Sequence, residues 1–402
     1  MHDRKPGIVH YRITQCAAWL VAKFIFRRKI LRNELKGKRG PFVVIANHET
    51  VLDFVNLIGL TGFPMNFVIS KSFFSTLPIK GFMTRMGVLP KQQFQTTVKD
   101  MKMMKRVVDA GGGLVIYPAG LMCEDGLSTP IPAATYKFLK WLGVDVYVAR
   151  ASGTYFVMPK WAKGIRPGRT YMDVYKLFDR ENLKKLTVDE IREKTDEALL
   201  FDAYREQETL QVPYKGGEQI QGLENVLYLC PNCKAEFTVE NKNGNSMCCS
   251  HCGYEVTADA MGFLHNHKPL GPQMRYVSDW SRMIGDHIRS QIQEGQLQTL
   301  SAPVRIQMVD DRKNKFVDAG QGVLTLQAEG FRLEGQLGGE ELSLSVAIGN
   351  VPALPFSPGK HLELQHGNDI YRCLPEDGRI VMKFINMLKC FHALETGVMV
   401  EE

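Results

Sequence analysis

The sequence predicts an α/β fold in which a mostly parallel sheet is flanked by helices, followed by a cysteine-rich segment and a small antiparallel β domain. Three observations predict this organisation. Strand-like and helix-like segments alternate over residues 41–205, two Cys-x2-Cys pairs lie within residues 229–256, and apolar residues recur with a period of two from about residue 303 to 375. A chain of 402 residues has enough material for two or three domains.

Residues 1–40 are predicted to form a basic amphipathic segment. They contain eleven Lys or Arg residues against two acidic residues, whereas the whole chain carries a net charge of only +7. The stretch from Ile8 to Phe26 is apolar but is interrupted by Arg12 and Lys23, and no run of 18 apolar residues occurs in the chain. This pattern predicts an interfacial helix whose cations face an anionic membrane surface.

The N-terminus lacks the layout of a secretory signal peptide, because its most apolar stretch is short and flanked by charge. The nine cysteines are too few and too clustered for a secreted disulfide framework. We therefore expect a cytoplasmic protein that is peripheral on the inner face of the cell membrane.

Residues 41–205 are predicted to form the α/β domain. Helices are expected between and after its strands, for example over 98–109 and 188–206. A run of glycines at 111–113 lacks the following Lys-Ser or Lys-Thr of a phosphate-binding loop, so no nucleotide cofactor is expected. The strand-like segments are residues 41–46, 66–70, 113–117, 145–151 and 170–177.

Residues 206–228 are polar and include a Lys-Gly-Gly sequence, which predicts a linker. In the following segment, 229–256, two Cys-x2-Cys pairs are separated by fifteen residues. Four thiolates at this spacing can converge tetrahedrally on Zn²⁺, so we predict a zinc ribbon with a closed, structural site. Cys248 is an alternative to the third ligand but breaks the two-residue gap; the predicted ligands are Cys230, Cys233, Cys249 and Cys252.

Residues 257–402 are predicted to form an amphipathic helix and a β-rich C-terminal domain. The helix is expected over 276–294, where apolar residues recur at helical spacing. Alternating residues such as Leu342, Leu344 and Val346 predict strands, with Gly-rich turns between them, and a final helix is expected over 378–394. Antiparallel strands closed by one terminal helix resemble a pleckstrin-homology-like barrel.

His48 and Asp53 are the candidate catalytic residues, within Ala46-Asn47-His48-Glu49-Thr50-Val51-Leu52-Asp53. Two side chains five positions apart cannot easily meet within one straight helix, but a loop leading into a helix can fold the carboxylate onto an imidazole nitrogen. That contact would fix the tautomer and raise the basicity of the other nitrogen. Such a pair predicts a general base that takes a proton from an attacking hydroxyl.

This stretch resembles the His-x4-Asp motif of the glycerolipid (1-acylglycerol-3-phosphate and lysophospholipid) acyltransferase family, and the resemblance covers about residues 10–205. Three further stretches follow in the family's order: 67–91, with Phe67-Val68-Ile69-Ser70-Lys71 and Met86-Gly87-Val88-Leu89-Pro90-Lys91; 112–120; and 146–160. The resemblance implies transfer of a fatty acyl group from acyl-CoA or acyl carrier protein to a lysophospholipid or glycerolipid-like hydroxyl. His48 would act as the base and Asp53 would orient it.

The sequence departs from the family pattern in two places. Where the third motif usually reads Glu-Gly-Thr-Arg, this chain has Ala119-Gly120-Leu121-Met122, and the second motif ends in Lys91 where Arg is common. In the family these polar residues help to hold the acceptor's phosphate, so a bidentate guanidinium is missing. The predicted substrate-binding residues are Lys71, Arg85 and Lys91, which supply positive charge, and Gly120, whose surrounding N–H groups are candidates for the oxyanion site.

Two other functions fit parts of the sequence. The altered third motif fits a non-catalytic lipid-binding scaffold. A zinc ribbon with a basic arm fits a module that binds protein or nucleic acid, but the mixed charges around the ribbon give no electrostatic footprint for nucleic acid, so none is expected as a partner.

Overall fold

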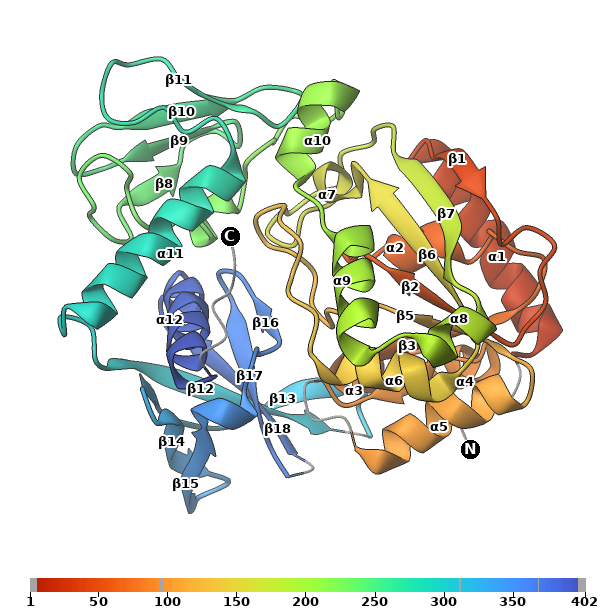
Figure 1. Cartoon of the computed structure of the whole chain (residues 1–402). Helices are drawn as coiled ribbons and strands as arrows, with labels where there is room; N and C mark the ends of the chain where they lie inside the picture. The colour runs from red at the N-terminus through yellow and green to blue at the C-terminus, as the bar shows by residue number, and fades with distance from the viewer. Residues whose placement is uncertain (1–5, 94–96, 311, 368, 397–402) are drawn as a thin grey trace. The chain divides into compact units, whose positions relative to one another are not determined.

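The computed structural model describes residues 6–93, 97–310, 312–367 and 369–396. Residues 1–5 of the predicted basic segment and residues 397–402 of the predicted C-terminal domain lie outside the described residues. The chain divides into two compact units, one made of residues 1–160 and 165–216 and the other of 161–164 and 217–402 (Figure 1). The division after residue 216 falls inside the segment predicted as a linker.

The first unit is built on a seven-stranded mixed sheet in the order β1-β7-β6-β2-β5-β3-β4. The five strands from β6 to β4 run parallel, and β7 is antiparallel to β6 and parallel to β1. The predicted parallel-rich α/β architecture is therefore confirmed. The strands are β1 Lys29–Asn33, β2 Phe42–Ala46, β3 Met65–Ser70, β4 Leu89–Lys91, β5 Gly113–Ile116, β6 Asp145–Ser152 and β7 Tyr171–Phe178.

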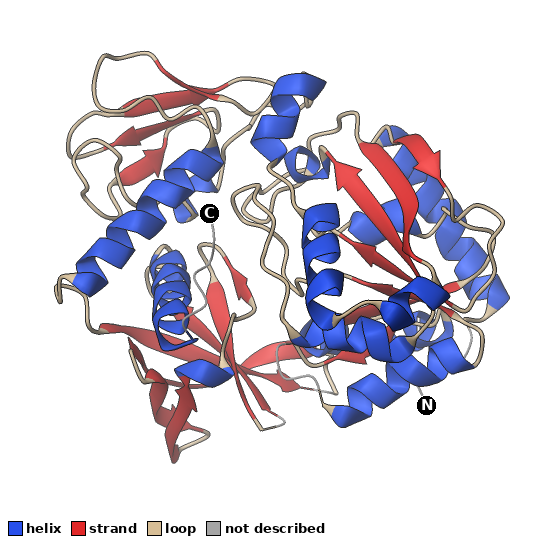
Figure 2. Ribbon diagram, in the orientation of Figure 1, coloured by secondary structure: helices blue, strands red, loops and turns tan. Residues whose placement is uncertain are grey.

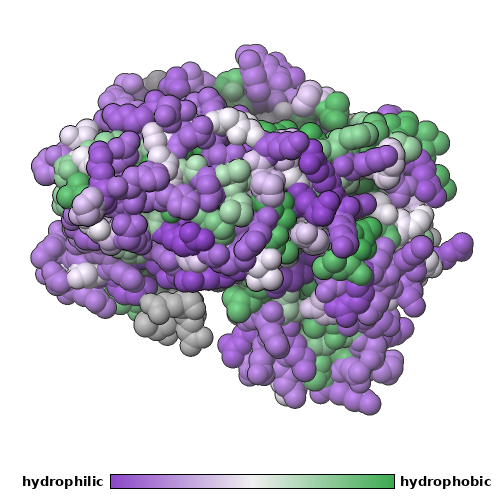
Figure 3. Space-filling model, turned by 90° about the horizontal axis from the view of Figure 1, so that it is seen from above, coloured by the Kyte–Doolittle hydropathy of each residue, from purple (hydrophilic) through white to green (hydrophobic). Residues whose placement is uncertain are grey.

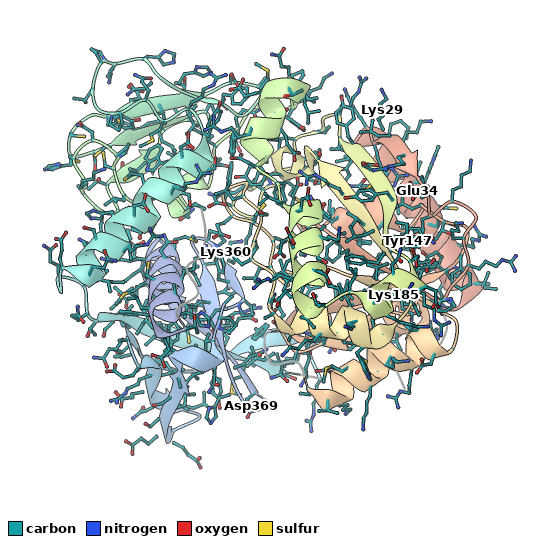
Figure 4. The ribbon with its side chains drawn as sticks, in the orientation of Figure 1. Lys29, Glu34, Tyr147, Lys185, Lys360 and Asp369 are labelled. Atoms are coloured by element: carbon teal, nitrogen blue, oxygen red, sulfur yellow. The ribbon has the colours of Figure 1, made fainter. Side chains whose placement is uncertain are left out.

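Helices cover both faces of this sheet (Figure 2). Every residue of β2 is buried, and successive residues point to opposite faces: Val44 joins one apolar cluster and Val43 the other. Tyr147 (Figure 4) lies in the first cluster, with its ring edge-on to Phe42 at 5.9 Å. The first face is covered by α1 Ile8–Phe24, α2 Asp53–Leu57, α3 Lys71–Ser75 and α4 Lys80–Arg85, and the second by α5 Val98–Asp109, α6 Ala134–Leu142, α8 Arg180–Lys185 and α9 Val188–Leu199.

Two short helices complete this unit, α7 Thr154–Val157 and α10 Ala203–Leu210. The single helix predicted over 188–206 is wrong, because α9 ends at Leu199 and a new helix begins at Ala203. Leu200 is extended, and the side chain of Asp202 accepts the N–H groups of Tyr204 and Arg205. Asp202 therefore caps a second helix, which interrupts the first.

The helix α1 buries one face and exposes an apolar one. Tyr11, Ala18 and Ala22 are buried, whereas Val9, Ile13, Leu20 and Phe24 are at least half exposed. In the space-filling view, hydrophobic atoms are interspersed with hydrophilic ones on the side where α1 and β1 lie (Figure 3). Among the described residues, no helix combines the length and the hydropathy needed to cross a membrane.

The second unit contains two antiparallel sheets. The first has the order β11-β10-β9-β8, and the second has the order β15-β14-β13-β12-β18-β17-β16. Between them α11 Val277–Gln293 buries Trp280, whose indole N–H donates to the Leu229 carbonyl at 2.8 Å. The helix α12 Ile380–Thr396 packs Phe384 near Phe331 of the second sheet.

The remaining elements of this unit are η1 Leu223–Asn225, β8 Val239–Asn241, β9 Ser246–Cys249, β10 Glu255–Ala258, β11 Leu264–Asn266, β12 Leu300–Asp310, β13 Lys315–Gln327, β14 Gly330–Leu337, β15 Glu340–Ala347, η2 Ile348–Asn350, β16 Phe356–Ser357, β17 His361–His366 and β18 Asp369–Pro375. The antiparallel β structure expected in the C-terminal part is confirmed.

Candidate active site

His48 and Asp53 meet just beyond the carboxyl end of β2. The Nδ1 atom of His48 lies 2.8 Å from Oδ2 of Asp53. The same Oδ2 accepts the backbone N–H groups of Glu49 at 2.8 Å and Thr50 at 3.0 Å, so the loop wraps around the carboxylate. Asp53 is the first residue of α2 and is buried, whereas His48 is partly exposed. Asp53 therefore fixes one nitrogen of the imidazole and leaves Nε2 without a hydrogen-bond partner among the described residues.

A buried carboxyl group ties this loop to the neighbouring strand. Glu49 is 1% exposed; its Oε1 accepts the side-chain amide of Asn47 at 2.6 Å, and its Oε2 accepts the Thr154 hydroxyl at 2.7 Å and the Tyr155 N–H at 2.6 Å. Asn47 in turn pairs with both backbone groups of Ala151 on β6. Burial, together with the negative charge of Asp53, raises the pKa of Glu49 to about 8. Together these contacts hold the loop rigidly against β6 and α7.

Tyr117 forms one wall beside the imidazole. It follows β5, and its ring stacks on that of His48 with the centroids 4.3 Å apart. Its hydroxyl is buried and has no hydrogen-bond partner among the described residues, and Oδ1 of Asp53 is in the same state. Burial and the charge of Asp53 raise the pKa of Tyr117, so its hydroxyl stays protonated at neutral pH. The ring limits rotation of His48.

The topology gathers three of the predicted substrate-binding residues along one edge of the sheet. Strands β2, β5, β3 and β4 are adjacent and parallel, so their carboxyl ends lie together, the usual place for a ligand in such sheets. His48 follows β2, Gly120 follows β5, Lys71 follows β3, and Lys91 ends β4, paired with Ser70 in register. Lys71 is exposed. Lys91 is half-buried, and burial lowers its pKa.

Arg85 does not join this group. It is the last residue of α4 and precedes β4, so it lies toward the amino end of that strand. Its side chain is exposed, and its carbonyl accepts the N–H of Gly7 at 2.7 Å. The sequence order that linked Arg85 to Lys91 does not bring the two side chains to the same edge.

Gly120 closes a tight turn after β5. Its φ of 71° lies in the region that favours glycine, its N–H donates to the Tyr117 carbonyl, and its own carbonyl accepts the Gln93 side chain at 2.6 Å. The N–H of Gly120 is thus engaged within the turn. The next two N–H groups, those of Leu121 and Met122, have no partner in the part of the chain that the structure describes.

Comparisons with known proteins bear on this arrangement. Residues 27–157 match the sequence model of the family described as Acyltransferase. This segment is an acyltransferase domain. It includes β1 to β6 and every residue discussed above for the site except Gly7.

Among solved structures, this chain is similar to the 1-acyl-sn-glycerophosphate (LPA) acyltransferase PlsC from Thermotoga maritima. The identity is 16% and the TM-score 0.36, over 46% of this chain and 79% of that chain. No curated protein matches this sequence.

Cys123 is the one cysteine near His48 in the described part of the acyltransferase domain, and its N–H donates to the His48 carbonyl at 3.1 Å. Burial, followed by the charges of Glu49 and nearby acidic residues, raises the pKa of its thiol well above the ordinary value. A thiol that stays protonated is a poor nucleophile, so Cys123 supports the turn and offers no covalent route.

Sequence reasoning missed Asn47, Glu49 and Tyr117 as parts of the site. Asn47 and Glu49 stand inside the quoted motif, but their partners lie about 100 residues away on β6 and α7. Tyr117 was assigned to a strand; its ring contact with His48 depends on β2 and β5 being neighbours. No spacing in the sequence indicates that Asn47 and Glu49 contact β6 and α7, or that the ring of Tyr117 stacks on His48.

In the second unit, four cysteine sulfurs converge and can hold a metal ion. All four lie within 4.8 Å of one another, with 3.6 Å between Cys230 and Cys252 and 3.8 Å between Cys233 and Cys249. Tetrahedral thiolates at about 2.3 Å from a metal lie about 3.8 Å apart, so the donor set fits. Cys248 is not among the four, and its Sγ donates to the Cys249 carbonyl.

Proposed function

We propose that this protein transfers a fatty acyl group from an acyl-CoA or acyl-carrier-protein thioester to the hydroxyl of a lysophospholipid or similar glycerolipid. The observation that carries the proposal is the contact between His48 Nδ1 and Asp53 Oδ2, with two backbone N–H groups on the same oxygen. An imidazole held in this way presents Nε2 as a general base. The family match of residues 27–157 supports acyl transfer as the reaction class.

In the proposed mechanism, Nε2 of His48 takes the proton of the acceptor hydroxyl as its oxygen attacks the thioester carbonyl carbon. The tetrahedral intermediate then collapses, the C–S bond breaks, and the leaving thiolate takes the proton from the imidazolium. Asp53 keeps the imidazole in one tautomer and stabilises its protonated form. No side chain of the protein becomes acylated.

Electrostatic stabilisation is assigned to the turn after β5 and to the nearby lysines. The unpartnered N–H groups of Leu121 and Met122 are the candidate oxyanion donors, in place of the N–H of Gly120. Lys71 and Lys91 are the candidate contacts for an acceptor phosphate. Both are point charges, and Met122 offers no side-chain donor, so headgroup discrimination is expected to be broad.

We also propose that the protein is peripheral on the inner face of the cell membrane. The support is the exposed apolar face of α1, which carries Val9, Ile13, Leu20 and Phe24 beside Arg12 and Lys23. A helix of this kind lies among headgroups and places its apolar residues at the acyl-chain boundary.

For the second unit we propose a structural Zn²⁺ ribbon and a pleckstrin-homology-like barrel. Zn²⁺ suits four thiolates, and two polar side chains contact the sulfurs of the second Cys-x2-Cys pair: Asn232 donates to Cys252 Sγ at 3.4 Å, and the Thr238 hydroxyl lies 3.2 Å from Cys249 Sγ. The barrel proposal is supported by seven antiparallel strands followed by α12.

The test is acyl transfer by the purified full chain, with a long-chain acyl-CoA and a panel of lysophospholipids. We expect turnover with at least one acceptor, and loss of turnover in His48→Ala with unchanged circular dichroism. His10→Ala is the matched control, since His10 is also in the first unit but contacts Phe82 instead of a carboxylate. Equal turnover in both variants would refute the assignment of His48.

The altered turn favours a second candidate, a lipid-binding scaffold without turnover. Ala119 and Met122 stand where charged residues are usual in the resemblance stated above. This candidate predicts lipid binding by the wild-type protein and by His48→Ala alike, with no product from any donor, including acyl carrier protein thioesters.

A further inference from the structure

A hollow of about 1000 Å³ lies on the first unit between α1, the chain around β1, and the segment that follows α2. We call it the α1–β1 groove. Its walls include Arg12, Trp19 and Leu20 from α1, Arg28 and Lys36 on either side of β1, and residues 59–62. The groove is lined by Val55 of α2 and by residues 59–62 after that helix, but not by His48, Asp53 or Tyr117 of the candidate active site.

Two backbone carbonyls at or next to the groove accept hydrogen bonds from side chains. The Ile58 carbonyl accepts the Tyr11 hydroxyl at 3.2 Å and the Gln15 amide at 3.3 Å, and the Leu60 carbonyl accepts the Asn33 amide at 2.8 Å. A Cβ added at Gly62 would meet nothing within 4 Å. The absence of a side chain there keeps the hollow open.

Three cations line the groove: Arg12, Arg28 and Lys36. No Asp or Glu is among the described residues that line it, and none of the three cations forms an ion pair with a described carboxylate. Arg28 donates one N–H to the Asn56 carbonyl, which leaves most of its five donors for another partner. Burial lowers the pKa of Arg28, the sign of a guanidinium held in a partly dry position without a counter-charge.

The groove also has apolar walls open to solvent. Trp19 is 54% exposed, Leu20 50% and Ile30 40%. An inorganic anion would leave these surfaces uncovered, and an uncharged lipid would leave the cations unpaired. A ligand that satisfies both has an anionic headgroup joined to an apolar chain, and α1 carries its exposed apolar face beside this groove.

We infer that the α1–β1 groove binds one anionic phospholipid from the membrane, its phosphate between Arg12, Arg28 and Lys36 and the start of its chains against Trp19 and Leu20. The guanidinium of Arg28 can grip two phosphate oxygens at once, whereas Lys36 adds charge at the rim. This site goes beyond the proposed acyl transfer, because it holds a lipid that is not the substrate and needs neither His48 nor turnover.

The experiment is calorimetric titration of the full chain with dihexanoyl phosphatidylglycerol, kept below its micelle concentration. The groove variant is Arg12→Gln/Lys36→Gln; the control is Arg27→Gln/Lys29→Gln, which removes the same charge from exposed positions that do not line the groove. Figure 4 labels Lys29, the first residue of β1. Because the substituted cations are exposed, both variants should fold. Arg28→Lys tests the bidentate grip while it keeps the charge.

We expect one lipid bound per chain, an affinity at least about tenfold weaker in the groove variant, and less than about a twofold change in the control. The lipid affinity of Arg28→Lys should lie between those of the groove variant and the control. Dihexanoyl phosphatidylcholine and inorganic phosphate should each bind at least about tenfold more weakly than the anionic lipid. Equal losses in the two double variants would overturn the site, and so would phosphate or phosphatidylcholine binding as tightly as phosphatidylglycerol. None of these outcomes depends on acyl transfer, so the two proposals can fail separately.

Discussion

At the scale of residues, the pair His48 and Asp53 is held by more than its own contact. Oδ2 of Asp53 accepts three hydrogen bonds, two of them from the backbone of the loop that carries His48. The carboxylate therefore sets both the shape of the loop and the tautomer of the ring. The spacing of the two residues was sufficient to predict their contact, because the motif follows a strand and opens a helix.

The role of Asp53 can be tested with Asp53→Asn. The amide keeps the size of the side chain, but it has no negative charge to stabilise the protonated imidazole, and its NH₂ would take the place of Oδ1, which is buried without a hydrogen-bond partner among the described residues. We expect kcat to fall by about 10³–10⁴-fold with KM little changed, as when a triad carboxylate is lost. Steady-state kinetics with the best acceptor of the panel will measure it. A rise in KM alone, or a kcat within about tenfold of wild type, would contradict the orienting role.

Glu49 should make stability depend on pH. Its folded pKa of about 8 is raised above the ordinary value of 4.5, so the folded state binds the proton more tightly. This contribution is complete below pH 4.5 and is lost as the pH rises toward 8. We expect Glu49→Gln to remove that part of the pH dependence. Urea unfolding of both proteins between these pH values will measure it, and parallel curves would contradict the assignment.

Met122 bears on the choice of acceptor. Restoring a guanidinium at this position adds a charge-assisted contact worth about 1.5–3 kcal/mol, or roughly 10- to 100-fold. We expect Met122→Arg to raise kcat/KM for lysophosphatidate relative to lysophosphatidylethanolamine, measured in one competitive assay. Leu121→Arg is the control, since it places the same charge one residue earlier. A wild-type protein already exclusive for lysophosphatidate would show that Lys71 or Lys91 has replaced the missing guanidinium.

At the scale of elements, the central strands could be predicted to within one or two residues, because β2, β3, β5 and β6 are apolar runs bounded by turns. The edge strands β1 and β4 could not be predicted in this way. Four of the five residues of β1 are exposed, and β4 has three residues, one of them Pro90, so neither shows a buried run or an alternation. They form because β7 and β3 each present a strand edge, with which β1 and β4 pair.

The helix α1 is both a structural and a surface element, which changes how membrane binding is tested. Tyr11 donates its hydroxyl to Ile58, and β1 pairs with β7. Deleting residues 1–40 would therefore open the core and confuse a binding defect with unfolding. Substitutions on the exposed face of α1 avoid this problem.

We expect Ile13→Asp and Phe24→Asp each to weaken binding to anionic vesicles by about tenfold or more, because each loses apolar burial and adds a negative charge. Salt should weaken binding of the wild-type protein by screening. Vesicle sedimentation will measure both effects. Val98→Asp is the control, since Val98 is 60% exposed at the start of α5. Equal losses in all three variants would refute a binding role for this face of α1.

At the scale of the whole molecule, the two compact units differ in what stabilises them. The first unit has a sheet with apolar clusters on both faces. Such a sheet requires buried strands alternating with helices, and this alternation is visible in the sequence. The Cys-x2-Cys spacing likewise predicted the convergence of four sulfurs. The spacing could not indicate that the ribbon and the β domain share one compact unit. That depends on contacts between distant residues, such as the Trp280 indole N–H donating to the Leu229 carbonyl and the Lys383 ammonium donating to the Glu236 carboxylate.

If Zn²⁺ occupies the four-cysteine site, its removal should act on one unit only. The metal would link chain segments 16 to 22 residues apart, so its binding energy would contribute to the folding of the ribbon. The acyltransferase domain has no ligand in the cluster. We therefore expect a chelator to lower one thermal transition while a second transition, belonging to the first unit, stays in place.

Differential scanning calorimetry with and without chelator will measure this, alongside acyl transfer at a temperature below both transitions. Cys230→Ser should reproduce the effect of the chelator, and Cys248→Ser, beside the cluster but outside it, should not. Activity should persist in the chelated protein, because His48 and its partners lie in the unit without the metal. Freshly purified protein without zinc would refute the metal assignment. A single transition that shifts as one would mean that the two units unfold together, so that the ribbon stabilises the whole chain.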